Sequence, residues 1–258
     1  MRLSAVAICF SVLVSACAAR KPHGSTTPTP PVNPTVDVEP LHLRAERSGE
    51  GFYVQAYDAQ SLFEQGLDLM RQGDCDAANE AFDTLSAGFP ESRYLSAALY
   101  NAGLCLQRQS RWEEAAKRYE TLLRVRPASR DVKHAGFQLA FLYLETARWE
   151  DALATADALL ARADLDSDER VEAMARRAAA LLGRSEVEAA ATAAQATLRF
   201  YRTRAEQARV KDPHFVASAS YTLAETLRLR SEAIEIPLAA VAQQHEVLES
   251  RAQLLLAA

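Results

Sequence analysis

A spacing of 37 to 38 residues recurs through the middle of the chain and constrains its fold more than any other feature. Repeats of about 20 to 50 residues are typical of solenoids, in which each unit packs against its neighbours. Alanine and leucine are abundant and glycine is scarce, so each unit is expected to be helical. Two series of small residues carry the spacing: Gly66, Gly103, Ala140 and Ala178, and, twelve residues after each, Ala78, Ala115, Ala152 and Ala190.

The spacing within a unit predicts two antiparallel helices that approach closely. Small residues remove bulk where helices cross, so we expect Gly66 to face Ala78 and Gly103 to face Ala115. Trp112 and Trp149 hold one equivalent position, and each is followed by two acidic residues and an alanine. Two second helices are also predicted to begin with capping boxes, which are Ser110 with Glu113 and Ser185 with Glu188.

This arrangement resembles the tetratricopeptide repeat (TPR), with its two small residues, a following bulky residue at Phe82 and Tyr119, and a terminal proline at Pro90 and Pro127. The resemblance implies an all-α TPR superhelical solenoid of about four regular helical hairpins and a divergent C-terminal hairpin. The expected repeats, within a domain of residues 57–197, are 59–92, 96–129, 133–166 and 171–204. Residues 198–258 are expected to form an extended helix and a C-terminal capping hairpin.

The N-terminus has the features of an export signal. An apolar run from Leu3 to Val14 follows Arg2 and is too short to cross a membrane. The end of the run, Val14-Ser15-Ala16-Cys17, resembles the bacterial lipobox, which implies a signal peptide of residues 1–16 and a covalent lipid (palmitate among its acyl chains) on Cys17. An ordinary signal peptide with an incidental cysteine is the alternative.

The resemblance to bacterial lipoproteins also implies a location. Ala18 replaces the aspartate that favours retention in the inner membrane, so we expect the chain to be anchored to the outer membrane, facing the periplasm. Proline is frequent among residues 20–40, and a segment of this composition buries little apolar surface. Residues 17–56 are therefore predicted to be a lipidated cysteine followed by a disordered, flexible tether.

Composition and motifs exclude several functional classes. Aspartate and glutamate (34) outnumber lysine and arginine (29), which argues against nucleic-acid binding. The five histidines are scattered, and no catalytic, metal-binding or phosphate-binding motif is present. We predict a protein that is not an enzyme, with no metal and no cofactor apart from the lipid on Cys17.

Two further cysteines are predicted to meet in space. In TPR geometry, Cys75 at the start of one helix and Cys105 near the end of the next lie at the same level of the stack. An exported protein can form disulfides, so a Cys75–Cys105 bridge is one hypothesis. Two buried free thiols used as small apolar residues are the other.

The TPR resemblance implies that the first helix of each hairpin lines an inner groove. Here the groove positions are apolar and lack the lysine and asparagine set that binds a C-terminal carboxylate in some TPR domains. We therefore predict a groove for an apolar peptide or helix; the alternative is that these residues pack on one another or on the tether. The predicted groove residues are Phe63, Leu67, Met70, Tyr100, Leu104, Phe137, Phe141 and Leu144.

These features predict a non-enzymatic scaffold that recruits or assembles periplasmic or outer-membrane proteins; its oligomeric state stays open. Residues 89–106, FPESRYLSAALYNAGLCL, are similar to a junction found in BamD-like outer-membrane assembly lipoproteins and in the TPR division coordinator of the Tol-Pal system. An accessory or activator of a cell-wall or division enzyme is an alternative, and a structural stabiliser of the envelope is another.

Overall fold

The computed structural model describes residues 40–48, 51–207, 213–234 and 241–257. The predicted signal peptide, Cys17 and the proline-rich part of the tether up to residue 39 lie outside the described residues.

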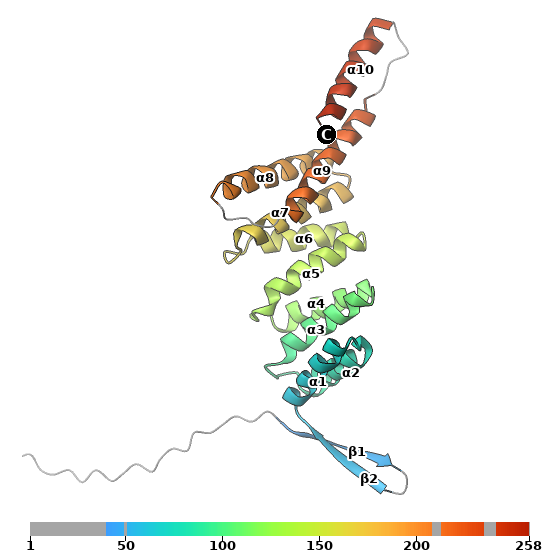
Figure 1. Ribbon diagram of the computed structural model, residues 1–258, viewed down its shortest axis with the longest axis vertical. Helices are drawn as coiled ribbons and strands as arrows, with labels where there is room; N and C mark the ends of the chain where they lie inside the picture. The colour runs from blue at the N-terminus through green and yellow to red at the C-terminus, as the bar shows by residue number, and fades with distance from the viewer. Residues whose placement is uncertain (1–39, 49–50, 208–212, 235–240, 258) are drawn as a thin grey trace, which may run out of the picture. The chain divides into compact units, whose positions relative to one another are not determined.

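The described part of the chain folds into ten helices that follow one another as antiparallel hairpins, each helix packing on the next (Figure 1). This confirms the predicted all-α solenoid. The fourth hairpin ends with α8 at Ala205, and α9 begins directly after Pro213. The helices are α1 (Ala59–Gln72), α2 (Cys75–Gly88), α3 (Leu95–Arg108), α4 (Trp112–Val125), α5 (Asp131–Glu145), α6 (Trp149–Leu160), α7 (Ser167–Gly183), α8 (Val187–Ala205), α9 (His214–Glu232) and α10 (Val241–Leu256).

A β-hairpin occupies the end of the segment that was predicted to be a flexible tether. Strand β1 (His42–Ser48) pairs antiparallel with β2 (Gly51–Tyr57), in a register that places His42 opposite Tyr57 and Ser48 opposite Gly51. The His42 ring also lies 4.3 Å from the ring of Phe89, at the end of α2. The prediction of a tether to residue 56 is therefore wrong for residues 42–48 and 51–56. The sequence of β2, GFYVQAY, is rich in the aromatic and β-branched residues that favour strands.

Each of the first four hairpins turns through one residue in the left-handed backbone region. These residues are spaced like the repeats: Gly73, Ser110, Ala147 and Ser185, with φ angles of 87°, 58°, 55° and 63°. In every case the next residue donates its N–H to the carbonyl five residues earlier, which is the Schellman pattern that ends a helix. These hydrogen bonds are Asp74 to Leu69, Arg111 to Leu106, Arg148 to Tyr143 and Glu186 to Leu181.

This turn geometry explains why both predicted capping boxes are wrong. Ser110 and Ser185 sit in the left-handed turn that ends the preceding helix, so neither is the N-cap of the next one. The N-caps of α4 and α8 are Arg111 and Glu186, which make no side-chain cap hydrogen bond. Capping boxes occur instead at α1 (Asp58 with Ser61) and α7 (Asp166 with Glu169).

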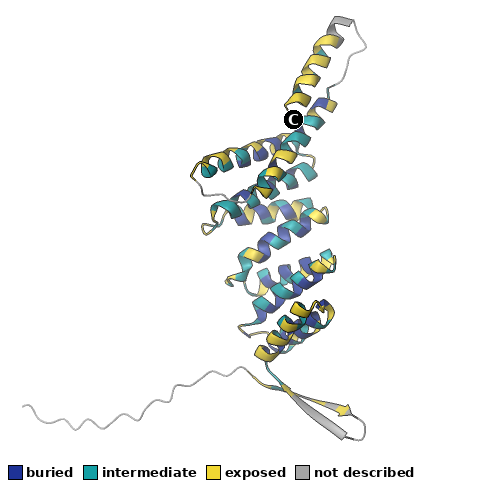
Figure 2. Cartoon of the chain, viewed as in Figure 1, coloured by how far each residue is buried: buried dark blue, intermediate teal, exposed yellow. Residues whose placement is uncertain are grey.

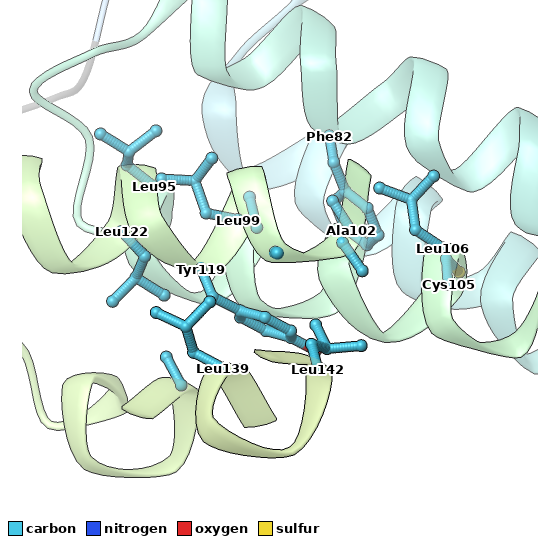
Figure 3. Packing of buried hydrophobic residues seen from close by; sticks show 14 of the residues in the cluster. Phe82, Leu95, Leu99, Ala102, Cys105, Leu106, Tyr119, Leu122, Leu139 and Leu142 are labelled. Atoms are coloured by element: carbon cyan, nitrogen blue, oxygen red, sulfur yellow. The ribbon is translucent and has the colours of Figure 1, made fainter. Parts of the chain in front are cut away.

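Phe82 and Tyr119 belong to the buried apolar core of the first three hairpins (Figure 3), and each ring contacts a glycine of the facing helix. Phe82 and Tyr119 are fully buried, and they occupy the space where Gly66 and Gly103 lack a side chain. The residues closest to the two glycines are therefore these rings rather than Ala78 and Ala115. In the next two hairpins the bulky residue is replaced by a buried alanine, Ala156 and Ala194.

Burial is deepest through the central hairpins and decreases in the last one (Figure 2). Helix α10 packs on α9, and Leu255 and Leu256 of α10 are 52% and 88% exposed. The apolar C-terminal leucines therefore do not form a buried cap in this structure.

Candidate binding groove

The odd-numbered helices form one continuous face of the solenoid. Contacts between alternate helices join α1 to α3, α3 to α5, α5 to α7 and α7 to α9. The first helices of successive hairpins thus lie side by side, with the even-numbered helices behind them. This is the arrangement in which the predicted groove positions share a surface.

Seven of the eight predicted groove residues lie half-buried on three of these helices. Because half-buried apolar side chains keep part of their surface available, they form a candidate contact surface, here called the apolar row. Its members are Phe63, Leu67, Met70, Tyr100, Leu104, Phe141 and Leu144.

Phe137 differs from the other predicted groove residues. Its side chain is only 6% exposed and packs with Ala140, Leu159 and Ala173 between α5, α6 and α7. Phe137 therefore presents almost none of its surface to the predicted groove. Residue spacing alone did not distinguish Phe137 from Phe141. Helix α5 has more buried residues than α1, so a position that is half-buried on α1 can be fully buried on α5.

A short polar chain runs beside Tyr100 in the middle of the apolar row. The Tyr119 hydroxyl donates to Gln107 Oε1 at 2.6 Å, and Gln107 Nε2 donates to Gln138 Oε1 at 3.0 Å. Burial raises the pKa of the Tyr100 hydroxyl, and a hydrogen bond with Gln138 opposes the shift. Tyr100 is therefore neutral at physiological pH and presents an uncharged ring to the groove.

A hollow of about 890 Å³ lies at the α1–α3 end of the row and is here called the first hollow. Phe63 and Tyr94 form part of its wall, with their rings stacked at 5.3 Å. Its rim is made by the loops that precede α3 and α5, including Arg93, Arg126 and Arg130. The row therefore opens into a partly basic recess.

A second hollow, of about 450 Å³, lies at the other end of the row between α5, α7 and α9. Phe141 and Leu144 of the row line it together with Arg176 and Phe215. The guanidinium carbon of Arg176 lies 5.9 Å from the centre of the Phe141 ring and 5.4 Å from that of Phe215. Cation–π contacts thus hold the aromatic rings around this hollow.

Arg176 is the most deeply buried charge at the candidate site. It pairs with Glu172 one turn earlier and donates a hydrogen bond to the backbone carbonyl of Phe137. Burial lowers the pKa of its guanidinium, and the Glu172 carboxylate opposes the shift. Its charge is therefore balanced within the fold, and it serves to fix α7 against α5. The sequence did not predict this role of Arg176, since no motif marks an arginine that faces an aromatic cluster.

Cys75 and Cys105 meet between α2 and α3, as the TPR resemblance implied. Both side chains are buried, and the structure has them as two free thiols. Burial raises the pKa of the Cys105 thiol to about 12, and a hydrogen bond with Cys75 adds to the shift. The Cys105 thiol is therefore not a reactive nucleophile in this form.

The described residues contain neither a metal-binding cluster nor a membrane-spanning helix. No three histidine, cysteine, aspartate or glutamate side chains of these residues gather as they would around a metal ion. Among the helices in the described ranges, none combines the length and apolarity needed to span a bilayer.

A family model described as a tetratricopeptide repeat matches residues 63–129, which contain most of the first hairpin and the whole of the second. This part of the chain is therefore similar to tetratricopeptide repeat proteins. None of the curated protein sequences matches the chain.

Solved structures, two of them described as tetratricopeptide repeat proteins, extend the likeness to the remaining hairpins at the level of the fold. A tetratricopeptide repeat protein from Parabacteroides merdae is 19% identical, with a TM-score of 0.53, over 76% of this chain and 66% of that one. A MamA RS-1 double mutant is 16% identical, with a TM-score of 0.52, over 77% and 95% of the two chains. YrrB, described as a TPR protein with an unusual peptide-binding site, is 16% identical, with a TM-score of 0.52, over 76% and 86%.

Proposed function

We propose that this chain is a non-enzymatic scaffold that binds a segment of a partner protein along the odd-numbered helices. One observation carries the proposal: a row of half-buried apolar side chains on α1, α3 and α5 connects two hollows. Such a surface suits an extended peptide or an amphipathic helix, whose apolar side chains enter hollows at regular intervals. The similar fold of YrrB, which has a peptide-binding site, supports this use of the helices.

A paired substitution tests the groove. Tyr100→Ala with Phe141→Ala removes two rings of the apolar row, while Phe200→Ala with Tyr201→Ala removes two half-buried rings from the even-numbered α8, outside the row. Circular dichroism first confirms that both variants are folded. We expect a crosslinked pull-down from cell envelopes to lose a partner with the first pair and to keep it with the second. Equal capture by both variants would contradict a binding role for the row.

The location of the scaffold is a second part of the proposal. The lipobox-like sequence ending at Cys17 supports a lipid anchor in the outer membrane, facing the periplasm, as in BamD-like lipoproteins. Two or three acyl chains anchor a protein stably, at about 0.8 kcal/mol per buried methylene group. The partners would then be periplasmic or outer-membrane proteins.

The anchor is tested by mass spectrometry and membrane fractionation. We expect the mature protein to begin at a diacylated Cys17 and to sediment with the outer membrane, and Cys17→Ser to lose both the lipid and the sedimentation. An unmodified N-terminus elsewhere in the chain would exclude the lipoprotein.

A further inference from the structure

Two inter-repeat loops of this chain share a four-residue pattern. Pro90-Glu91-Ser92-Arg93 joins α2 to α3, and Pro127-Ala128-Ser129-Arg130 follows α4 and leads into α5, 37 residues later. Residues of both loops line the first hollow. The pattern P-x-S-R therefore places two equivalent arginines at one recess.

The fold accounts for two of the shared residues. Each proline follows a helix that it cannot continue. Each serine hydroxyl accepts the backbone N–H two residues later, from Tyr94 to Ser92 at 3.1 Å and from Asp131 to Ser129 at 3.1 Å. Arg130 has no comparable backbone role, because it is exposed and, as the N-cap of α5, makes no side-chain cap hydrogen bond.

The charges around the hollow leave a positive excess. Three arginines and two carboxylates line it. The Glu91 carboxylate lies 3.4 Å from the Arg126 guanidinium, and the Asp131 carboxylate accepts a hydrogen bond from the Ser129 hydroxyl at 3.1 Å. Both acids thus have partners within the wall, and the guanidinium of Arg130 remains available to a ligand.

Apolar groups lie beside these charges. The Phe63 and Tyr94 rings are stacked, the Arg93 guanidinium lies 4.8 Å from the centre of the Tyr94 ring, and Val125 is 37% exposed. Guanidinium groups form strong, directed hydrogen bonds with carboxylates, and the rings offer contact area to an apolar side chain.

We propose that the first hollow binds an acidic segment of the partner protein, whose carboxylates meet Arg130 and Arg93 while an apolar side chain packs on Tyr94 and Phe63. This inference rests on the proposed function, because Phe63 belongs to both the hollow and the apolar row. A peptide fits better than an anionic membrane surface, since the aromatic wall lies inside a recess of about 890 Å³ that a flat lipid surface does not enter.

Fluorescence anisotropy with defined probes tests the proposal. The probes are a labelled twelve-residue peptide of alternating glutamate with leucine or phenylalanine, and the same peptide with lysine for glutamate. The proteins are the full chain, Arg93→Glu, Arg130→Glu and, as a matched charge control, Arg199→Glu on the exposed surface of α8. We expect the acidic peptide to bind more tightly than the basic one, and both loop variants to weaken it about tenfold or more, with no change for Arg199→Glu.

Three results would overturn the proposal: equal binding of the two peptides, equal loss in Arg199→Glu, or Arg130-dependent binding of phosphatidylglycerol vesicles without peptide binding. Tyr100→Ala with Phe141→Ala separates this inference from the proposed function. If a captured partner needs those rings but tolerates Arg93→Glu and Arg130→Glu, the scaffold stands and the acidic-segment site falls.

Discussion

Gly103 on α3 packs directly against the ring of Tyr119 on α4, so that a methyl group at residue 103 would lie 2.5 Å from the ring carbon Cζ. Gly66 has the same relation to Phe82 in the first hairpin. In these two hairpins the small residue of the first helix thus contacts the bulky residue of the second. This contact sets the distance between the two helices. Where the bulky position carries Ala156 or Ala194, the small position of the same repeat carries Ala140 or Ala178, and all four alanines are buried.

Gly103→Ala should therefore destabilise the fold even though alanine favours helices. The added methyl group cannot coexist with the Tyr119 ring, and such overpacking costs about 1 to 3 kcal/mol of unfolding free energy. Urea unfolding measures the effect. In a Tyr119→Ala background the clash is absent, so the same substitution should cost little. An equal cost in both backgrounds would show that the ring does not set the helix spacing.

The left-handed turn offers a stabilising substitution. Ala147 has a φ of 55°, which costs alanine energy and costs glycine none. We expect Ala147→Gly to raise the free energy of unfolding by about 0.5 to 1 kcal/mol. Ala154→Gly, at an exposed position within α6, makes the same chemical change in a helix and should lower it by a similar amount. A loss of stability at both positions would contradict the turn geometry.

The two thiols provide a test of the compartment. If the chain is exported, we expect Cys75 and Cys105 to be oxidised to a disulfide with a periplasmic disulfide donor, which accepts the two electrons and two protons. Denatured, unreduced protein from the envelope should then contain no free thiol at these positions. In the chain-entropy model, a loop of about 30 residues adds roughly 3 to 4 kcal/mol of stability.

Protein made in the reducing cytosol is the control. It should show both thiols after denaturation and little reaction before it, because burial raises the pKa of the Cys105 thiol to about 12. Two free thiols in the envelope form would exclude the bridge and support the alternative of buried thiols.

Arg176→Ala should destabilise the junction between α5 and α7. The substitution removes the Arg176–Glu172 ion pair and the hydrogen bond from Arg176 to the Phe137 carbonyl, at a cost of about 3 kcal/mol or more. The neighbouring Arg177 pairs with Asp157 at a more exposed position, so Arg177→Ala should cost at most about 1 kcal/mol. Thermal unfolding compares the two, and equal effects would rule out a structural role for the buried pair.

The sequence predicted the helical solenoid because its period and its small residues report on packing that repeats. The prediction failed at the turns. Serine is common at N-cap positions, and only the backbone conformation shows that Ser110 and Ser185 end the preceding helix. It also missed the β-hairpin at 42–57, where proline-rich composition upstream outweighed a short strand pattern.

The candidate site was only partly predictable for a related reason. Helical spacing places Phe137 and Phe141 on one side of α5, but burial depends on the neighbouring α6 and α7, whose packing the spacing does not encode. Arg176 meets residues of α5 and α9 at the second hollow, and the arginines of the two P-x-S-R loops meet at the first hollow. Both groups of residues come from different repeats, so no local motif marks them.

Site-specific photocrosslinking tests the central claim most directly. A benzoylphenylalanine at Leu104, in the middle of the apolar row, is compared in living cells with one at Lys117, exposed on α4. We predict that the probe at residue 104 crosslinks one defined partner and that the probe at residue 117 does not. Crosslinks to that partner only from residue 117, or none from residue 104 while the partner still co-purifies, would contradict binding along the odd-numbered helices.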